Sequence, residues 1–100
     1  QGIANSVGMA VAERILNEIF GDDFVDHFTY ALVGDGFLME GLAHEAISLA
    51  GHLNLGKFIW LYDDNGMTYH CTIDQKISED YSVRFACAGW HVIECVGHDH

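Results

Sequence analysis

Two short polar segments in this sequence carry oxygen ligands of the kind that a magnesium ion prefers. Asp35 stands between Gly34 and Gly36, and Asn65 follows about thirty residues later. Mg²⁺ takes about six hard oxygen ligands, and rarely takes all of them from protein. A carboxylate from Asp35, the amide oxygen of Asn65 and a backbone carbonyl at Met67 would therefore leave positions open for phosphate oxygens and water.

The glycines beside Asp35 admit two interpretations. Gly36 has no side chain, so a diphosphate can approach the backbone there, and a helix that begins near Leu38 would direct unpaired N–H groups at such an anion. However, aspartate and glycine are also standard turn residues, and Gly-Asp-Gly alone is more typical of a turn. The second polar segment at Asn65 is what favours a binding site.

Alternating helices and strands are needed to position the two segments. Apolar residues recur at helical spacing in three ranges, 3–20, 38–53 and 78–89. Short apolar runs rich in β-formers lie between and after them, at 28–34, 57–64 and 90–96. This order predicts an α/β fold with a parallel sheet and flanking helices. Ligands bind beyond the carboxyl ends of such strands, so we expect the two polar turns to lie side by side.

Glycines and small polar residues mark the expected ends of these helices. Gly21 should end the first helix and Gly89 the third, with Ser78 as a possible N-cap of the third. Gly8 lies inside the first helix, where glycine costs about 1 kcal/mol relative to alanine. We therefore expect close packing at Gly8.

Composition excludes several classes of partner and compartment. The net charge is −11 with only four lysines and arginines, which argues against nucleic acid and anionic membrane surfaces. No apolar stretch reaches the ~20 residues of a membrane span. Three cysteines without a CxxC pair indicate reduced thiols and a cytoplasmic location. The chain begins without methionine and in the middle of a pattern, so we expect a piece of a longer protein.

The polar segments and their surroundings resemble the transketolase family. Gly-Asp-Gly followed by asparagine some thirty residues later is similar to the thiamine diphosphate motif. "GDGFLMEG", "SLAGHLNLGK" and "YDDNG" resemble transketolase or its relative dihydroxyacetone synthase, and so do "QGIANSVGMAVAE" and "RFACAGWHVIECVGHDH". The resemblance covers nearly the whole chain. It implies that residues 1–100 are part of a single diphosphate-binding, Rossmann-like domain of a longer chain.

The resemblance also implies roles for individual residues. Asp35, Asn65 and the Met67 carbonyl would hold Mg²⁺, with Ca²⁺ or Mn²⁺ as possible substitutes. Gly34 and Gly36 would lie at the diphosphate of thiamine diphosphate, and Met67 would pack against the cofactor. The cofactor carries the carbon–carbon chemistry, and the parent enzyme would transfer a two-carbon ketol unit from a ketose phosphate to an aldose phosphate.

Further implications concern the partner subunit and the groups that this chain lacks. Glu40 and Glu45 match glutamates of an acidic network at the interface of a homodimer. No catalytic residue is identified within the chain, because the glutamate that activates the cofactor lies in a later domain. The family usually continues from "DDNGI" into "S-I-D-G", whereas Tyr69, His70 and Cys71 stand here. Dihydroxyacetone synthase, another thiamine diphosphate enzyme and a non-catalytic truncated homologue that only binds a partner subunit are the alternatives.

Overall fold

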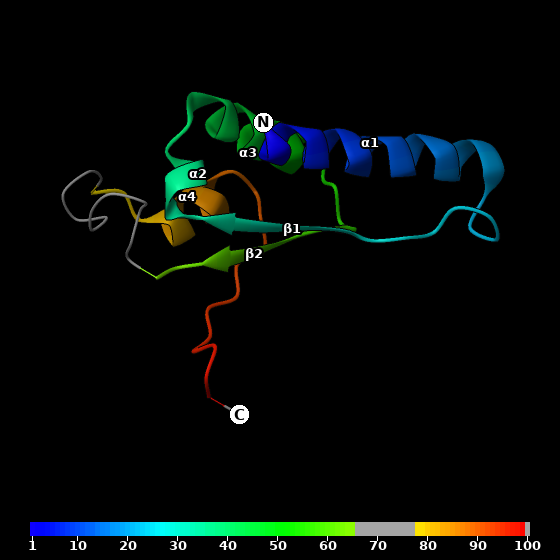
Figure 1. The fold of residues 1–100 in the computed structure, drawn as a ribbon. Helices are drawn as coiled ribbons and strands as arrows, with labels where there is room; N and C mark the ends of the chain where they lie inside the picture. The colour runs from blue at the N-terminus through cyan, green and yellow to red at the C-terminus, as the bar shows by residue number, and fades with distance from the viewer. Residues whose placement is uncertain (66–77, 100) are drawn as a thin grey trace.

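Two parallel strands, β1 (Thr29–Gly34) and β2 (Phe58–Asp63), form the centre of the computed structural model, which describes residues 1–65 and 78–99. The register pairs Thr29 with Phe58 at one end of the sheet and Gly34 with Asp63 at the other. Figure 1 shows the two strands side by side and pointing in the same direction. The prediction of an α/β fold with a parallel sheet is confirmed for this pair.

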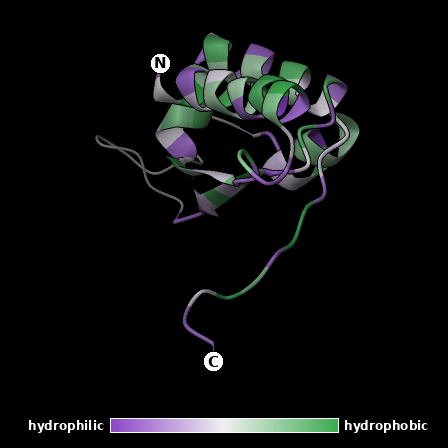
Figure 2. Ribbon diagram, turned by 90° about the vertical axis from the view of Figure 1, so that its right-hand side faces the viewer, coloured by the Kyte–Doolittle hydropathy of each residue, from purple (hydrophilic) through white to green (hydrophobic). Residues whose placement is uncertain are grey.

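Helices pack mainly on one face of the sheet. The described residues form α1 (Gly2–Phe20), α2 (Asp35–Leu38), α3 (Gly41–His52) and α4 (Tyr81–Cys87). α1 and α3 lie together over the strands, while α2 and α4 lie near the strands' carboxyl ends (Figure 1). The turned view shows the same helical layer on one side and the C-terminal tail extending to the other (Figure 2). None of the helices in the described ranges is long and apolar enough to cross a membrane.

An aromatic cluster joins α4 to the sheet. Trp60 of β2 lies 4.9 Å from Trp90, measured between ring centroids, and 5.6 Å from both Phe58 and Phe85. The indole N–H of Trp90 donates a hydrogen bond to the Ile47 carbonyl at 2.9 Å. This bond connects the aromatic cluster to α3. Aromatic pairs of this kind contribute beyond their buried area. The cluster therefore fixes the position of α4 relative to both β2 and α3.

The ends of the helices follow the expected chemistry with one change. Gly21 ends α1 and Gly89 follows α4, and both have positive φ, 83° and 87°, which glycine adopts without strain. Asp80, and not Ser78, is the N-cap of α4. Its carboxylate accepts a hydrogen bond from the Val83 amide at 3.1 Å. Ser78 lies two residues before this cap.

The helix predicted over 38–53 is wrong in its boundaries. The structure has two helices, and the break falls at Glu40, whose backbone is extended with φ −74° and ψ 137°. Leu38 at the end of α2 is fully buried, as is Ile47 in α3. The helical spacing of apolar residues continues through the break, because both helices bury side chains in the same core. The sequence pattern therefore did not reveal that one helix ends and another begins.

The strand predicted over 90–96 is also wrong. Residues 90–96 contain no strand, and no described strand pairs with them. Trp90 is held in the aromatic cluster, and beyond it the chain leaves the body of the molecule, with Ile93 77% and Val96 72% exposed (Figure 1). Alternating apolar residues become a strand only where a neighbour supplies the hydrogen-bond ladder.

Only the first part of α1 is buried. The apolar stripe of the helix runs along its whole length, but the buried residues are Ile3, Ser6, Val7, Ala10 and Glu13. The strands are six residues long, so the second half of α1 extends past the sheet (Figure 1). Its apolar side chains are accordingly exposed there.

Close packing at a glycine occurs in α3 and not, as predicted, at Gly8. A Cβ on Gly8 would meet no described atom within 4 Å, whereas a Cβ on Gly51 would lie 1.8 Å from the Ala88 carbonyl oxygen. The backbone at the end of α4 thus approaches α3 more closely than any side chain permits. Glycine at position 51 is a packing requirement.

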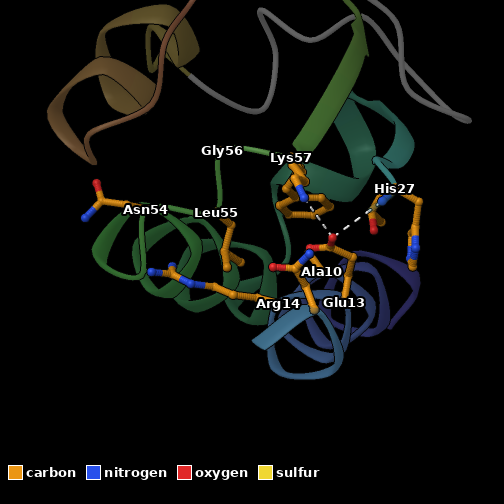
Figure 3. Close-up of a pocket in the computed structure, with 11 residues that line it drawn as sticks. Ala10, Glu13, Arg14, His27, Asn54, Leu55, Gly56 and Lys57 are labelled. Carbon is orange, nitrogen blue, oxygen red and sulfur yellow. Dashed lines mark hydrogen bonds and ion pairs between the residues drawn. The ribbon is translucent and has the colours of Figure 1, made fainter. Parts of the chain in front are cut away.

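An ion pair between a buried glutamate and a partly exposed lysine joins α1 to the beginnings of both strands. Glu13 is 5% exposed, and its Oε1 lies 3.1 Å from the Lys57 ammonium group just before β2. The same oxygen accepts from the His27 amide at 3.4 Å (Figure 3). Lys57 also pairs with Asp26 at 2.5 Å. The hydrogen bonds to both carboxylates raise the pKa of Lys57, so the lysine stays charged at neutral pH. A buried carboxylate needs such compensation.

We predict that Gly51→Ala lowers the thermal unfolding midpoint of the intact protein. The new methyl group must displace the Ala88 carbonyl, and overpacking of this kind costs about 1–3 kcal/mol. Gly8→Ala is the matched control. It should raise stability by about 0.4–1 kcal/mol, because the helix interior there is open. Equal midpoints for the two variants in differential scanning calorimetry would contradict the packing argument.

We predict that Lys57→Met destabilises the protein through Glu13. Loss of the ammonium group leaves the buried carboxylate without its counter-charge, so the unfolding midpoint should fall. The same substitution in a Glu13→Gln background should cost less, because no buried charge then loses its partner. Chemical denaturation of the parent, the two single variants and the double variant gives the coupling free energy between Glu13 and Lys57. An equal cost in both backgrounds would show that Glu13 and Lys57 act independently.

Candidate functional site

The two polar turns leave the same edge of the sheet. β1 ends at Gly34, which is paired in register with Asp63 at the end of β2. Asp35 follows the first strand directly as the first residue of α2, and Asn65 lies two residues past the second. The predicted convergence of the two strand ends is therefore confirmed. It follows from the parallel pairing alone, because parallel strands end at one edge.

Asp35 is a buried carboxylate whose two oxygens differ in their surroundings. The residue is 2% exposed. Its Oδ1 accepts a hydrogen bond from the Tyr62 hydroxyl, whereas Oδ2 is buried without a partner among the described residues. A buried oxygen of this kind carries an uncompensated desolvation cost. A cation bound at Oδ2 would remove that cost, so the residue fits the predicted role of metal ligand.

Tyr62 was missed by the sequence interpretation. Burial raises the pKa of its phenol, and the hydrogen bond to Asp35 and the charge of that carboxylate raise it further, so the group stays protonated and donates. Tyr62 pairs with Val33, which is 3% exposed, on the helix-covered face of the sheet. The two-residue period of β2 could have placed it there. A buried tyrosine hydroxyl then calls for a partner.

Asn65 is oriented by a neighbour. Its side-chain nitrogen donates to Asp63 Oδ2 at 2.8 Å, which assigns the nitrogen to the Asp63 side of the amide. The amide oxygen, the atom that a metal site requires, therefore lies on the other side. Asp63 is exposed, and its bond to Asn65 gives it a role in orienting the amide that the sequence did not indicate.

Neither glycine beside Asp35 is required by the backbone. Gly34 is extended, with φ −128° and ψ 173°, and neither Gly34 nor Gly36 has the positive φ that favours glycine. A Cβ built on either would meet no described atom within 4 Å. The turn interpretation therefore loses its conformational argument. Open space beside the backbone of Gly36 is what the approach of a diphosphate would need.

The helix that follows Asp35 begins earlier than predicted. α2 starts at Asp35 and not near Leu38, with Gly34 as its N-cap. The first N–H groups of a helix lack acceptors within the helix. In this chain they belong to the Gly-Asp-Gly segment itself, so the unpaired donors and the carboxylate come from the same few residues.

Tyr81 of α4 completes the surroundings of Tyr62. Its ring meets the Tyr62 ring edge to face, with centroids 5.8 Å apart and planes at 79°. Tyr81 is 6% exposed, and its hydroxyl has no partner among the described residues. Burial raises the pKa of this phenol, and the charges of Glu79 and Asp35 raise it further. The C-terminal helix thus reaches back to the predicted site.

The remaining predicted residues are placed in part. Met67, Tyr69, His70 and Cys71 lie outside the described residues. Both glutamates of the predicted interface network are exposed. Glu40 is the N-cap residue of α3, and Glu45 lies within α3 beside a shallow groove. They remain candidates for a subunit contact.

A cavity of about 280 Å³ lies at the opposite end of the strands (Figure 3). It is bounded by α1 and by the segment that leads into β2, and Glu13, Lys57 and Arg14 contribute its charged groups. Glu13 and Lys57 pair with each other, and the Arg14 guanidinium donates to the Leu53 carbonyl. With its charges already satisfied, this cavity lacks the unpaired group seen at Asp35.

The described residues contain no group of three histidine, cysteine, aspartate or glutamate side chains that could hold a metal. The predicted ligand set does not need one. It combines a single carboxylate with an amide oxygen and a backbone carbonyl, and leaves the other positions to phosphate and water.

Comparison with known proteins identifies the family. The family model "Transketolase, thiamine diphosphate binding domain" matches residues 1–100. A transketolase of Cereibacter sphaeroides is 55% identical over 98% of this chain, and transketolase 1 of Escherichia coli K12 is 52% identical over 99%. The solved structure of transketolase from Leishmania mexicana superposes with a TM-score of 0.90, at 46% identity over 95% of the chain.

The chain spans 15% of the Cereibacter protein, 16% of the Escherichia protein and 15% of the Leishmania chain. The match therefore concerns one region of much longer relatives. Within that region the family model covers every residue. This chain belongs to the transketolase family, through its thiamine diphosphate binding domain.

Proposed function

We propose that this chain holds the metal and diphosphate part of a thiamine diphosphate site. The observation that carries the proposal is the buried, unpaired Oδ2 of Asp35 at the common edge of β1 and β2. A divalent cation held there by Asp35 would compensate the charge of the carboxylate and would supply positive charge for an anionic cofactor. The family's thiamine diphosphate binding domain supplies the identity of the diphosphate.

The residues take separate parts in this site. Asp35 would bind the ion, Mg²⁺ or in its place Ca²⁺ or Mn²⁺, and the amide oxygen of Asn65 and the Met67 carbonyl would complete the protein ligands. The bare backbone at Gly36 would lie against the diphosphate. When bound, thiamine diphosphate supplies the carbon–carbon bond chemistry. The chain's own residues neutralise the anionic end of the cofactor and orient it.

For the intact protein we propose transfer of a two-carbon ketol unit between sugar phosphates. The names of the relatives support this, and so does the resemblance of the segments around Asp35 and Asn65. We also propose that the protein acts as a homodimer, with Glu40 and Glu45 at the contact, since both are exposed, one just before α3 and the other within it. The exposed free thiols of Cys87 and Cys95 suit a cytoplasmic location.

Dihydroxyacetone synthase is the second candidate function, and the matching family model and relatives, which are named transketolase, favour the first. It would use the same metal and diphosphate site, so no residue described above separates it from transketolase. The two candidate enzymes differ in the aldehyde that accepts the two-carbon unit.

We predict that Asp35→Ala abolishes magnesium-dependent binding of thiamine diphosphate by the intact protein. The substitution removes the single carboxylate of the proposed ligand set, so the affinity should fall by more than the roughly 10–100-fold that loss of a partner behind a metal ligand costs. Isothermal titration calorimetry with Mg²⁺ and thiamine diphosphate measures this. Asp23→Ala is the control, because Asp23 is exposed in the turn after α1, and it should bind as the parent does. If Asp35→Ala bound thiamine diphosphate with unchanged affinity in the presence of Mg²⁺, the assignment of Asp35 as a metal ligand would be wrong.

We predict that the intact protein, with Mg²⁺ and thiamine diphosphate, converts a donor ketose phosphate and an acceptor aldose phosphate into a ketose phosphate two carbons longer than the acceptor and an aldose phosphate two carbons shorter than the donor. The lengthened ketose phosphate is the diagnostic product. Mass spectrometry identifies that product. Formation of dihydroxyacetone from formaldehyde, with no transfer to aldose phosphates, would favour the second candidate. If neither acceptor is used while the cofactor still binds, the non-catalytic interpretation is correct.

A further inference from the structure

Tyr62 reaches the predicted metal ligand from the neighbouring strand. It is next to last in β2, and its hydroxyl donates to Asp35 Oδ1 across the ends of the two strands. A phenol has one proton to donate. The bond therefore engages one carboxylate oxygen and leaves the other, Oδ2, buried and unpartnered among the described residues.

Holding Oδ1 fixes the direction in which Oδ2 points. A carboxylate that can rotate presents its oxygens to an ion in several ways, whereas one anchored at a single oxygen presents the other in one direction. Partners behind the ligand commonly play this part in metal sites. Asp35 is also enclosed, at 2% exposed, so water has little access to replace the Tyr62 contact.

Tyr62 is itself held in place. Tyr81, at 6% exposed, packs edge to face with the Tyr62 ring, with 5.8 Å between the ring centroids. Tyr81 belongs to α4, which the aromatic cluster around Trp60 and Trp90 fixes to β2. The hydroxyl of Tyr62 thus has a defined position before any ion binds.

We propose that Tyr62 is a positioning residue, which anchors Oδ1 of Asp35 so that Oδ2 faces the divalent cation in the geometry that Mg²⁺ requires. This inference rests on the proposed function, because it assumes that Asp35 is a metal ligand. It adds a residue that contacts neither the ion nor the diphosphate.

The choice of ion provides a test that a merely structural role would not affect. Mg²⁺ demands near-ideal octahedral geometry, whereas Ca²⁺ accepts irregular coordination. Tyr62→Phe keeps the ring and its contact with Tyr81 but releases Oδ1. The affinity for Mg²⁺ should therefore fall about 10–100-fold, and the affinity for Ca²⁺ should fall less.

The experiment is calorimetric titration of the intact protein with Mg²⁺ or Ca²⁺ at saturating thiamine diphosphate. Tyr30→Phe is the matched control. It removes the same hydroxyl from a tyrosine that is 62% exposed on the opposite face of β1, and it should leave both affinities unchanged. The ratio of the two affinities is measured on folded molecules, so a lower folded fraction of Tyr62→Phe does not change it.

Two outcomes would overturn the inference. Parental Mg²⁺ affinity in Tyr62→Phe, or an equal loss for both ions, would show that Tyr62 does not set the ligand geometry. If Asp35→Ala has lost Mg²⁺ in the same series, the proposed function stands without the role of Tyr62. If Asp35→Ala also binds Mg²⁺ as the parent does, the proposed function itself is wrong.

Discussion

The parallel pairing of β1 with β2 is the constraint on which the site depends. The register that sets Gly34 beside Asp63 brings together two turns that are about thirty residues apart in sequence. A shift of one residue would turn every side chain of a strand to the other face, and Tyr62 would then point away from Asp35. The ion pair of Glu13 with Lys57 secures the opposite end of the same two strands. Fold and site are thus determined by one register.

The positions of Asp35 and Asn65 could be predicted because they follow from a rule about strand ends, which needs only the order of the elements. The helix and strand patterns of 3–20, 28–34 and 57–64 were strong enough to supply that order. The prediction of a strand over 90–96 was wrong because a strand depends on a neighbour, and periodicity within a segment does not reveal one. The break at Glu40 was not predicted for a related reason. Both α2 and α3 contribute apolar side chains to the core, so the spacing of apolar residues does not mark where one helix ends.

Contacts between elements distant in the chain were the least predictable. Glu13 occupies a buried position in α1 only because Lys57, far along the sequence, compensates it. Tyr62 was indistinguishable from a core aromatic until its hydroxyl was seen beside Asp35. Both are polar groups whose burial is tolerated through a partner, and the identity of a partner is a property of the folded chain. The roles of the site residues in binding metal, cofactor and partner subunit stay predictions, and these residues are Gly34, Asp35, Gly36, Glu40, Glu45, Asn65 and Met67.

The aromatic cluster has an optical consequence. Trp60 and Trp90 are the chain's only two tryptophans, and their rings lie 4.9 Å apart at the junction of β2 and α4. Their emission therefore reports a single place in this domain, the contact that carries Tyr81 to Tyr62. Separation of α4 from the sheet would hydrate both indoles at once and shift that emission to longer wavelength. The fold thereby contains a built-in fluorophore pair beside its candidate cofactor site.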